Sequence, residues 1–173
     1  EEIAARLAGA TAPQRQHALL LDESSRTFVF EDVPSAPTPS LLRGFCAPVH
    51  LDDGLDAEAR LVQMTHDPDP FTRWEAGQRL MRDAILADSG ADVARPDPGR
   101  LAGALSRELD RAQEDPAFAA LALRAPDLAD LIQHAQAPDP DRLFAARGAV
   151  RSRLADALRP RLEALADAPG ETP

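Results

Sequence analysis

The spacing of hydrophobic residues along this chain changes near Gly54. Before it, apolar and polar residues alternate in short runs, as they do in strands that bury one face. Residues 27–30 and 41–51 alternate in this way, and residues 18–21 form a short apolar run. The segment 34–39 carries three prolines, which cannot donate ladder hydrogen bonds, and is predicted to connect strands. This first part of the chain therefore predicts strands.

After Gly54 the apolar residues recur every three to four positions, which is typical of amphipathic helices. Asp56 is a capping residue for a first helix, with Ala57, Leu61 and Met64 on its apolar side. Four Asp-Pro pairs then predict helix starts, because aspartate accepts a terminal N–H and proline needs none at the first position: Asp69-Pro70, Asp97-Pro98, Asp115-Pro116 and Asp139-Pro140. The later helices are predicted at residues 70–87, 98–112, 116–123, 126–133 and from 140 until Pro160 kinks or ends the last one.

Strands followed by helices predict an α+β fold. Six helices with short connections suggest antiparallel pairs stacked side by side, as in a helical solenoid. We expect a domain boundary between residues 53 and 54, a helical domain over residues 54–166 and a disordered tail over residues 167–173.

Charge and composition argue against several classes of partner. The net charge is −10 and both sides of Gly54 are acidic, so no basic stripe is offered to phosphates and no nucleic acid partner is expected. No apolar run approaches the roughly 20 residues that cross a bilayer, and the first residues lack a signal-peptide pattern, so no membrane partner is expected. Cys46 is the only cysteine and cannot form an internal disulfide, which favours a cytoplasmic location.

The triplet Arg73, Trp74 and Glu75 is the most distinctive group of side chains. On a helix Trp74 projects to one side, and the two charged residues flank it at about 100°. One interpretation makes this face an inter-domain contact with a catalytic domain. The other makes Trp74 the packing anchor of the first helical pair, with its neighbours solvated or paired, which is the commoner role of a lone tryptophan on an apolar stripe.

Other polar groups have structural explanations. His66, Asp67 and Asp69 are close in sequence, but they supply one nitrogen ligand on a turn, so we interpret His66 as a helix end and Asp69 as a helix cap. Cys46 lacks a neighbouring base and is interpreted as a small buried hydrophobe in a strand. We therefore predict no catalytic residue and no metal ligand in this sequence.

Three blocks of the sequence occur in a recognisable order: TFVFEDVP at residues 27–34, PSLLRGFCAPVHL at 39–51 and HDPDPFTRWEAGQRL at 66–80. In that order and spacing they resemble bacterial aminopeptidase N, a zinc metallopeptidase family, at the point where a β-sandwich leads into a helical C-terminal domain. The resemblance implies that residues 1–53 are the C-terminal part of an antiparallel β-sandwich, with a further strand within residues 2–7. It implies that residues 54–166 are the first part of the helical domain.

The resemblance also implies a function for the parent enzyme rather than for this chain. The family's helical His-Glu-x-x-His motif and its Gly-rich exopeptidase motif are both absent here. We therefore expect a non-catalytic structural fragment of a zinc-dependent aminopeptidase, with zinc in the parent and none bound by this chain. The helical part would help to cover the active site and limit entry to short peptides. Its partners would be the missing catalytic domain and, through the parent, peptide substrates.

Alternative interpretations remain open from the sequence. The chain could be a self-contained helical adaptor that binds a protein through its concave face, with the strands as an appendage. A stand-alone hydrolase is disfavoured, because no serine or cysteine is paired with a base. A chain that starts inside a sandwich exposes unpaired strand edges, so we also expect self-association through the strands, or strands folded back onto the first two helices.

Overall fold

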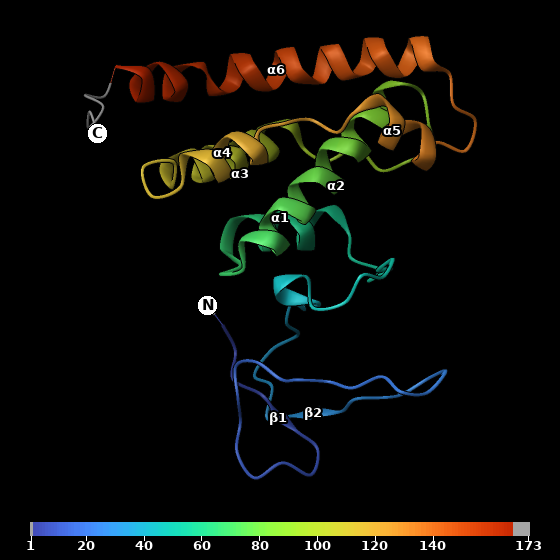
Figure 1. Ribbon diagram of the computed structural model, residues 1–173, viewed down its shortest axis with the longest axis vertical. Helices are drawn as coiled ribbons and strands as arrows, with labels where there is room; N and C mark the ends of the chain where they lie inside the picture. The colour runs from blue at the N-terminus through green and yellow to red at the C-terminus, as the bar shows by residue number, and fades with distance from the viewer. Residues whose placement is uncertain (1, 168–173) are drawn as a thin grey trace. The chain divides into compact units, whose positions relative to one another are not determined.

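The computed structural model describes residues 2–167, and the chain divides into two compact units between Pro39 and Ser40. Among the described residues of the first unit, one small antiparallel sheet is formed by β1 (Arg6–Leu7) and β2 (Phe30–Glu31) (Figure 1). Arg6 lies opposite Glu31 and Leu7 opposite Phe30. The His17 ring packs against Phe30 with centroids 5.1 Å apart, which adds a side-chain contact to this short ladder.

Much of the predicted strand content is replaced by irregular structure. Residues 18–21 lie outside any strand, so the strand predicted from their apolar run is wrong. Residues 41–51 contain a 3₁₀ turn, η1 (Arg43–Phe45). Leu42 just before it and Gly44 and Phe45 within it have φ of 56°, 63° and 53°. These left-handed angles are incompatible with an extended strand. Alternation indicates a strand when one face is buried, and neither segment has a buried face or a neighbouring strand within residues 2–167.

The prediction for Cys46 is also wrong. It follows the 3₁₀ turn η1 and its side chain is exposed, because the backbone that was expected to carry it into a sheet turns instead.

Six α-helices make up the second unit within residues 40–167 (Figure 1). They are α1 (Ala57–His66), α2 (Pro70–Asp88), α3 (Pro98–Asp110), α4 (Pro116–Ala122), α5 (Leu128–His134) and α6 (Pro140–Ala166). Each follows an aspartate whose carboxylate accepts an N–H of the first turn, which confirms the capping predictions at Asp56, Asp69, Asp97, Asp115 and Asp139. Helix α5 begins two residues later than predicted, because Asp127 caps it rather than the residue before Pro126.

The helices bury two apolar clusters within the described residues. The first is formed by α1, α2 and α3 with one residue of α6 and with Ala125 from the connection between α4 and α5, and its largest members are Leu61, Met64, Leu80, Met81, Leu101, Leu105, Leu109 and Leu158. The second is formed by the C-terminal part of α2 with α5 and α6, and its members are Ala84, Ile85, Leu86, Leu131, Leu143, Ala146 and Val150. Leu154 of α6 packs against both clusters. Gly77 allows α1 to approach α2, since a Cβ there would lie 3.3 Å from Met64 Cε.

Helix α6 continues to Ala166, so the predicted end at Pro160 is wrong. Proline removes one backbone hydrogen bond from a helix interior. Leu158 before it is buried in the first cluster and Leu165 after it packs on the same cluster, so tertiary contacts hold the helix on both sides of the proline. Of the predicted tail, residues 168–173 lie outside the described residues. No helix within residues 2–167 is long and apolar enough to cross a membrane.

Candidate functional site

In the turn between α1 and α2, the carboxylates of Asp67 and Asp69, which follow His66, accept hydrogen bonds. Asp67 Oδ1 accepts the Asp69 N–H at 2.9 Å, and Asp69 Oδ2 accepts the Thr72 N–H at 2.9 Å and the Thr72 hydroxyl at 3.0 Å. His66 stands in the last turn of α1, where a cation suits the helix dipole. Across residues 2–167, no group of three His, Cys, Asp or Glu side chains could hold a metal ion.

Arg73 reaches from α2 to α3 and to the preceding turn. Its Nε donates to Glu108 Oε1 at 2.9 Å, and its Nη1 donates to the carbonyl oxygens of Asp67 and Pro68 at 3.0 and 3.1 Å. The guanidinium also lies 5.5 Å from the centroid of the Phe118 ring on α4. Arg73 therefore fixes α2 against two neighbouring helices and does not pair with Glu75.

Glu108 is a charged side chain inside the helical core, 1% exposed. Its Oε1 accepts from Arg73 and from Arg111, and the Arg111 guanidinium also donates to the Thr65 carbonyl at 3.3 Å. Glu108 Oε2 has no partner. We did not select Glu108 from the sequence, although a signal existed: it follows Leu101 by seven positions and Leu105 by three, so it lies on the buried stripe of α3.

Trp74 lies at the more buried end of an aromatic patch, which we define as Phe45, Phe71 and Trp74. The Phe71 ring is 5.9 Å from Trp74 and 5.2 Å from Phe45, centroid to centroid. Trp74 is half-buried and belongs to neither core cluster, and its indole N–H has no acceptor. Phe45 is 58% exposed. The patch is therefore an apolar surface at the N-terminal end of α2.

Glu75 pairs along its own helix, because its Oε1 accepts from Arg79 Nε at 2.7 Å. Arg79 also donates to the Leu51 carbonyl at 2.9 Å and lies beside Asp53, which binds Arg60 at 2.7 and 3.2 Å. Burial alone would raise the pKa of Asp53, but hydrogen bonds from Arg60 and Leu55 and the nearby positive charges lower that pKa below its ordinary value. This ion-pair group ties residues 51–53 to α1 and α2.

Asp83 on α2 is a half-buried carboxyl for which burial raises the pKa above its ordinary value. Four basic side chains act in the opposite direction: Arg82, Arg60, Arg79 and His134. At neutral pH the negative charge of Asp83 is therefore disfavoured by the partial burial of its carboxylate in the folded protein.

Replacing Asp83 with asparagine is expected to raise the melting temperature by a few degrees at pH 7. A raised folded pKa means that the native state binds the proton more tightly than the unfolded state, so wild-type stability grows as pH falls through that pKa. The advantage of Asp83→Asn should therefore shrink between pH 7 and about pH 3.5. Thermal denaturation at both pH values checks this, with Asp92→Asn at an exposed position as the control. An equal advantage at both pH values would contradict it.

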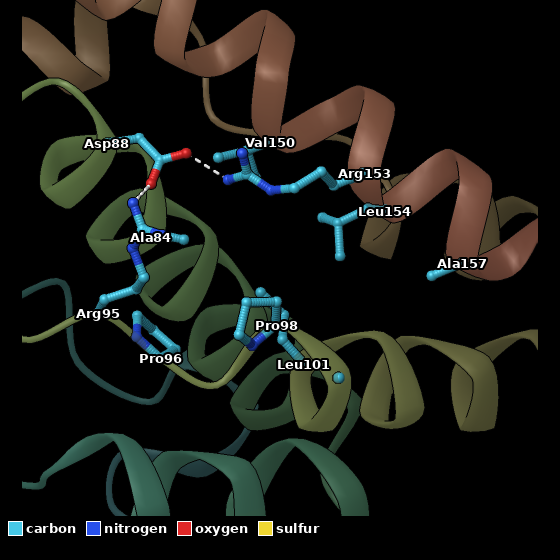
Figure 2. Close-up of a pocket in the computed structure, with 11 residues that line it drawn as sticks. Ala84, Asp88, Arg95, Pro96, Pro98, Leu101, Val150, Arg153, Leu154 and Ala157 are labelled. Carbon is cyan, nitrogen blue, oxygen red and sulfur yellow. Dashed lines mark hydrogen bonds and ion pairs between the residues drawn. The ribbon is translucent and has the colours of Figure 1, made fainter.

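A cavity of about 170 Å³ lies between α2, α6 and the segment that leads into α3 (Figure 2). Asp88 stands at one end, and its two carboxylate oxygens are shared between two cations: Oδ1 accepts from Arg95 and Oδ2 from Arg153. The remaining lining is apolar or glycine and comprises Ala84, Pro96, Pro98, Gly99, Leu101, Val150, Leu154 and Ala157. The lining contains no nucleophile beside a base.

Comparison with known proteins places this helical arrangement in a family. Residues 57–172 match a domain of unknown function (DUF3458_C) described as ARM repeats, and residues 2–54 match a domain of unknown function (DUF3458) described as an Ig-like fold. The chain belongs to this family. The match confirms the α+β fold predicted from the sequence, with an Ig-like segment followed by stacked helices.

Relatives of this DUF3458 chain carry the name Aminopeptidase N. The protein from Caulobacter vibrioides is 41% identical over 137 residues, which is 79% of this chain and 16% of that protein. The protein from Escherichia coli is 31% identical over 157 residues, 87% of this chain and 18% of that protein. The chain thus spans less than a fifth of these relatives. These matches confirm the resemblance to aminopeptidase N.

A solved structure shows a similar fold. Legionella pneumophila aminopeptidase A in complex with aspartic acid superposes with a TM-score of 0.67 at 22% identity, covering 85% of this chain and 19% of that one. At this identity the likeness supports the fold alone.

Proposed function

We propose that this chain is a non-catalytic structural part of a zinc-dependent aminopeptidase, an enzyme whose whole polypeptide removes N-terminal residues from peptides. The observation that carries the proposal is its 41% identity to an aminopeptidase N of which it spans only 16%. In this proposal, the activity belongs to the parent enzyme and the two units of this chain support it.

The charged groups of the described residues have structural roles that support this assignment. Glu108 joins α2 to α3, Asp53 joins residues 51–53 to α1, and Asp88 joins α6 to the segment before α3. The side chains within residues 2–167 do not fit a zinc site, because zinc usually takes three or four grouped ligands. The zinc-activated water of such a peptidase would be held by the rest of the parent enzyme.

The aromatic patch is the surface that we assign to the contact with the catalytic part of the parent. Phe45 is exposed, the Trp74 side chain is half-buried, and Glu75 of the same triplet is 37% exposed at its side chain. Half-exposed aromatic rings of this kind are enriched at protein interfaces. Held there, the helices would help to cover the active site and limit entry to short peptides.

The first experiment compares the purified chain with the full polypeptide. The chain alone should show no turnover of leucine arylamide and no stoichiometric zinc by elemental analysis, while the full polypeptide shows both. One bound zinc per isolated chain, or arylamide turnover that follows the chain through purification, would refute the proposal.

The second experiment tests the contact. Trp74→Ala should weaken binding of this chain to the separately expressed remainder of the parent by about tenfold or more, as expected for a buried aromatic at an interface. The matched control is Phe144→Ala on α6, an exposed aromatic outside the patch, which should leave binding unchanged. Equal affinities for wild type and Trp74→Ala would exclude the patch as the contact.

A further inference from the structure

The cavity beside Asp88 combines an apolar body with a cationic end. Figure 2 shows Arg95 and Arg153 converging on Asp88, while Leu154 and Leu101 line the space beyond them. Arg95 and Arg153 come from different elements, and their side chains are 51% and 48% exposed. Both guanidinium groups can therefore reach a ligand that enters from solvent.

The charges at this end do not cancel. Asp88 is 7% exposed at its side chain and offers one negative charge to two guanidinium groups, which leaves a net positive charge in a protein whose overall charge is −10. Each guanidinium has five N–H donors, and Asp88 accepts one from each arginine. Donors remain for a second carboxylate, which a guanidinium group can bind through two parallel charge-assisted N–H···O bonds. An amine or other cation would be repelled.

The volume limits what the apolar part can hold. Drug-sized ligands and cofactors occupy roughly 300–1,000 Å³, whereas an apolar cavity of roughly 150 Å³ accepts benzene. About 170 Å³ therefore suits a branched aliphatic group of a few carbons. We infer that this cavity binds a compact aliphatic carboxylate, with Arg95 and Arg153 holding the carboxylate and Leu101, Val150 and Leu154 surrounding the hydrocarbon.

The inference does not depend on the function proposed above. The cavity lies at the C-terminal end of α2, and the aromatic patch lies at its N-terminal end. Trp74 and Asp88 are 14 positions apart, which corresponds to roughly 20 Å along a helix. Two sources could supply the ligand, namely a free aliphatic acid or the C-terminal residue of a polypeptide, since both present a carboxylate beside a small hydrocarbon.

Calorimetric titration of the purified chain tests the inference with four compounds. We expect saturable binding of 4-methylpentanoate, of N-acetyl-leucine or of both, and none of the uncharged amides 4-methylpentanamide and N-acetyl-leucinamide. Binding of the first acid alone identifies a free acid as the source, and binding of the second alone identifies a polypeptide terminus. Absence of binding by both acids, or equal binding of acids and amides, overturns the inference.

Two variants and a control locate the site. Arg153→Gln should weaken acid binding by about tenfold, as expected for one charge-assisted contact, and leaves Asp88 paired with Arg95. Ala157→Leu should abolish binding by filling the cavity without changing charge. The control Arg151→Gln removes the same charge from an exposed position on α6 and should leave affinity within twofold. Equal weakening by Arg151→Gln and Arg153→Gln, or unchanged binding by a folded Ala157→Leu protein, would place the acid elsewhere.

Discussion

Replacing Glu108 with alanine is expected to lower the free energy of unfolding by about 3–5 kcal/mol. Glu108 is buried between Arg73 and Arg111, so its removal takes the carboxylate from two guanidinium groups, of which that of Arg111 is part-exposed and that of Arg73 is nearly buried. Arg73 is itself only 10% exposed at its side chain and cannot recover its hydration without a movement of α2 or α3. Urea unfolding followed by circular dichroism measures the loss.

The control for this prediction is Glu114→Ala, which removes the same side chain from an exposed position just after α3. It should stay within about 0.5 kcal/mol of wild type. If Glu108→Ala also stayed within that range, the Arg73–Glu108–Arg111 group would contribute no net stability, and its role in joining α2 to α3 would be refuted.

Replacing Leu80 with alanine should cost about 2–5 kcal/mol, because the leucine is fully buried where α1, α2 and α3 meet. The loss combines the transfer free energy of the missing methyl groups with the cavity that close-packed neighbours cannot fill. The expected result is a lower urea midpoint with an unchanged slope, since the surface exposed on unfolding stays the same.

Leu121→Ala is the matched control for Leu80→Ala, because it makes the same chemical change on α4 at a side chain that is 46% exposed. It should cost well under half as much. A similar loss at both positions would mean that burial does not determine the contribution of leucine in this unit.

The helices were predictable because their starts are encoded locally. The carboxylate of an aspartate before a proline accepts an N–H of the first turn, and all four helices predicted from such a pair begin at that proline. The strands were not predictable from alternation, because a strand needs a partner, and the backbone around Gly44 turns into left-handed angles. The distant pairing of Arg73 with Glu108, 35 positions apart, has no local signal beyond a charge on an apolar stripe.

The residues of the candidate site were predictable from the sequence, but the residues that they contact were not. The sequence singled out Arg73, Trp74 and Glu75 as one group, and the structure assigns them three different neighbours: a buried glutamate on α3, a phenylalanine ring and an arginine one turn away. A helix separates adjacent residues by about 100°, so neighbours in sequence meet different elements. The cavity beside Asp88 was not predictable because its lining comes from three separate stretches of chain, residues 84–88, 95–101 and 150–157.

Helix α2 supplies residues to both apolar clusters, Leu80 and Met81 to one and Ala84 and Ile85 to the other. The six-residue span 80–85 thus serves both halves of the helical unit, and neither half can unfold while the other keeps its full set of neighbours. Disruption anywhere in that span should make the whole unit lose structure in a single cooperative transition, whereas α4, with two buried alanines, can fray alone.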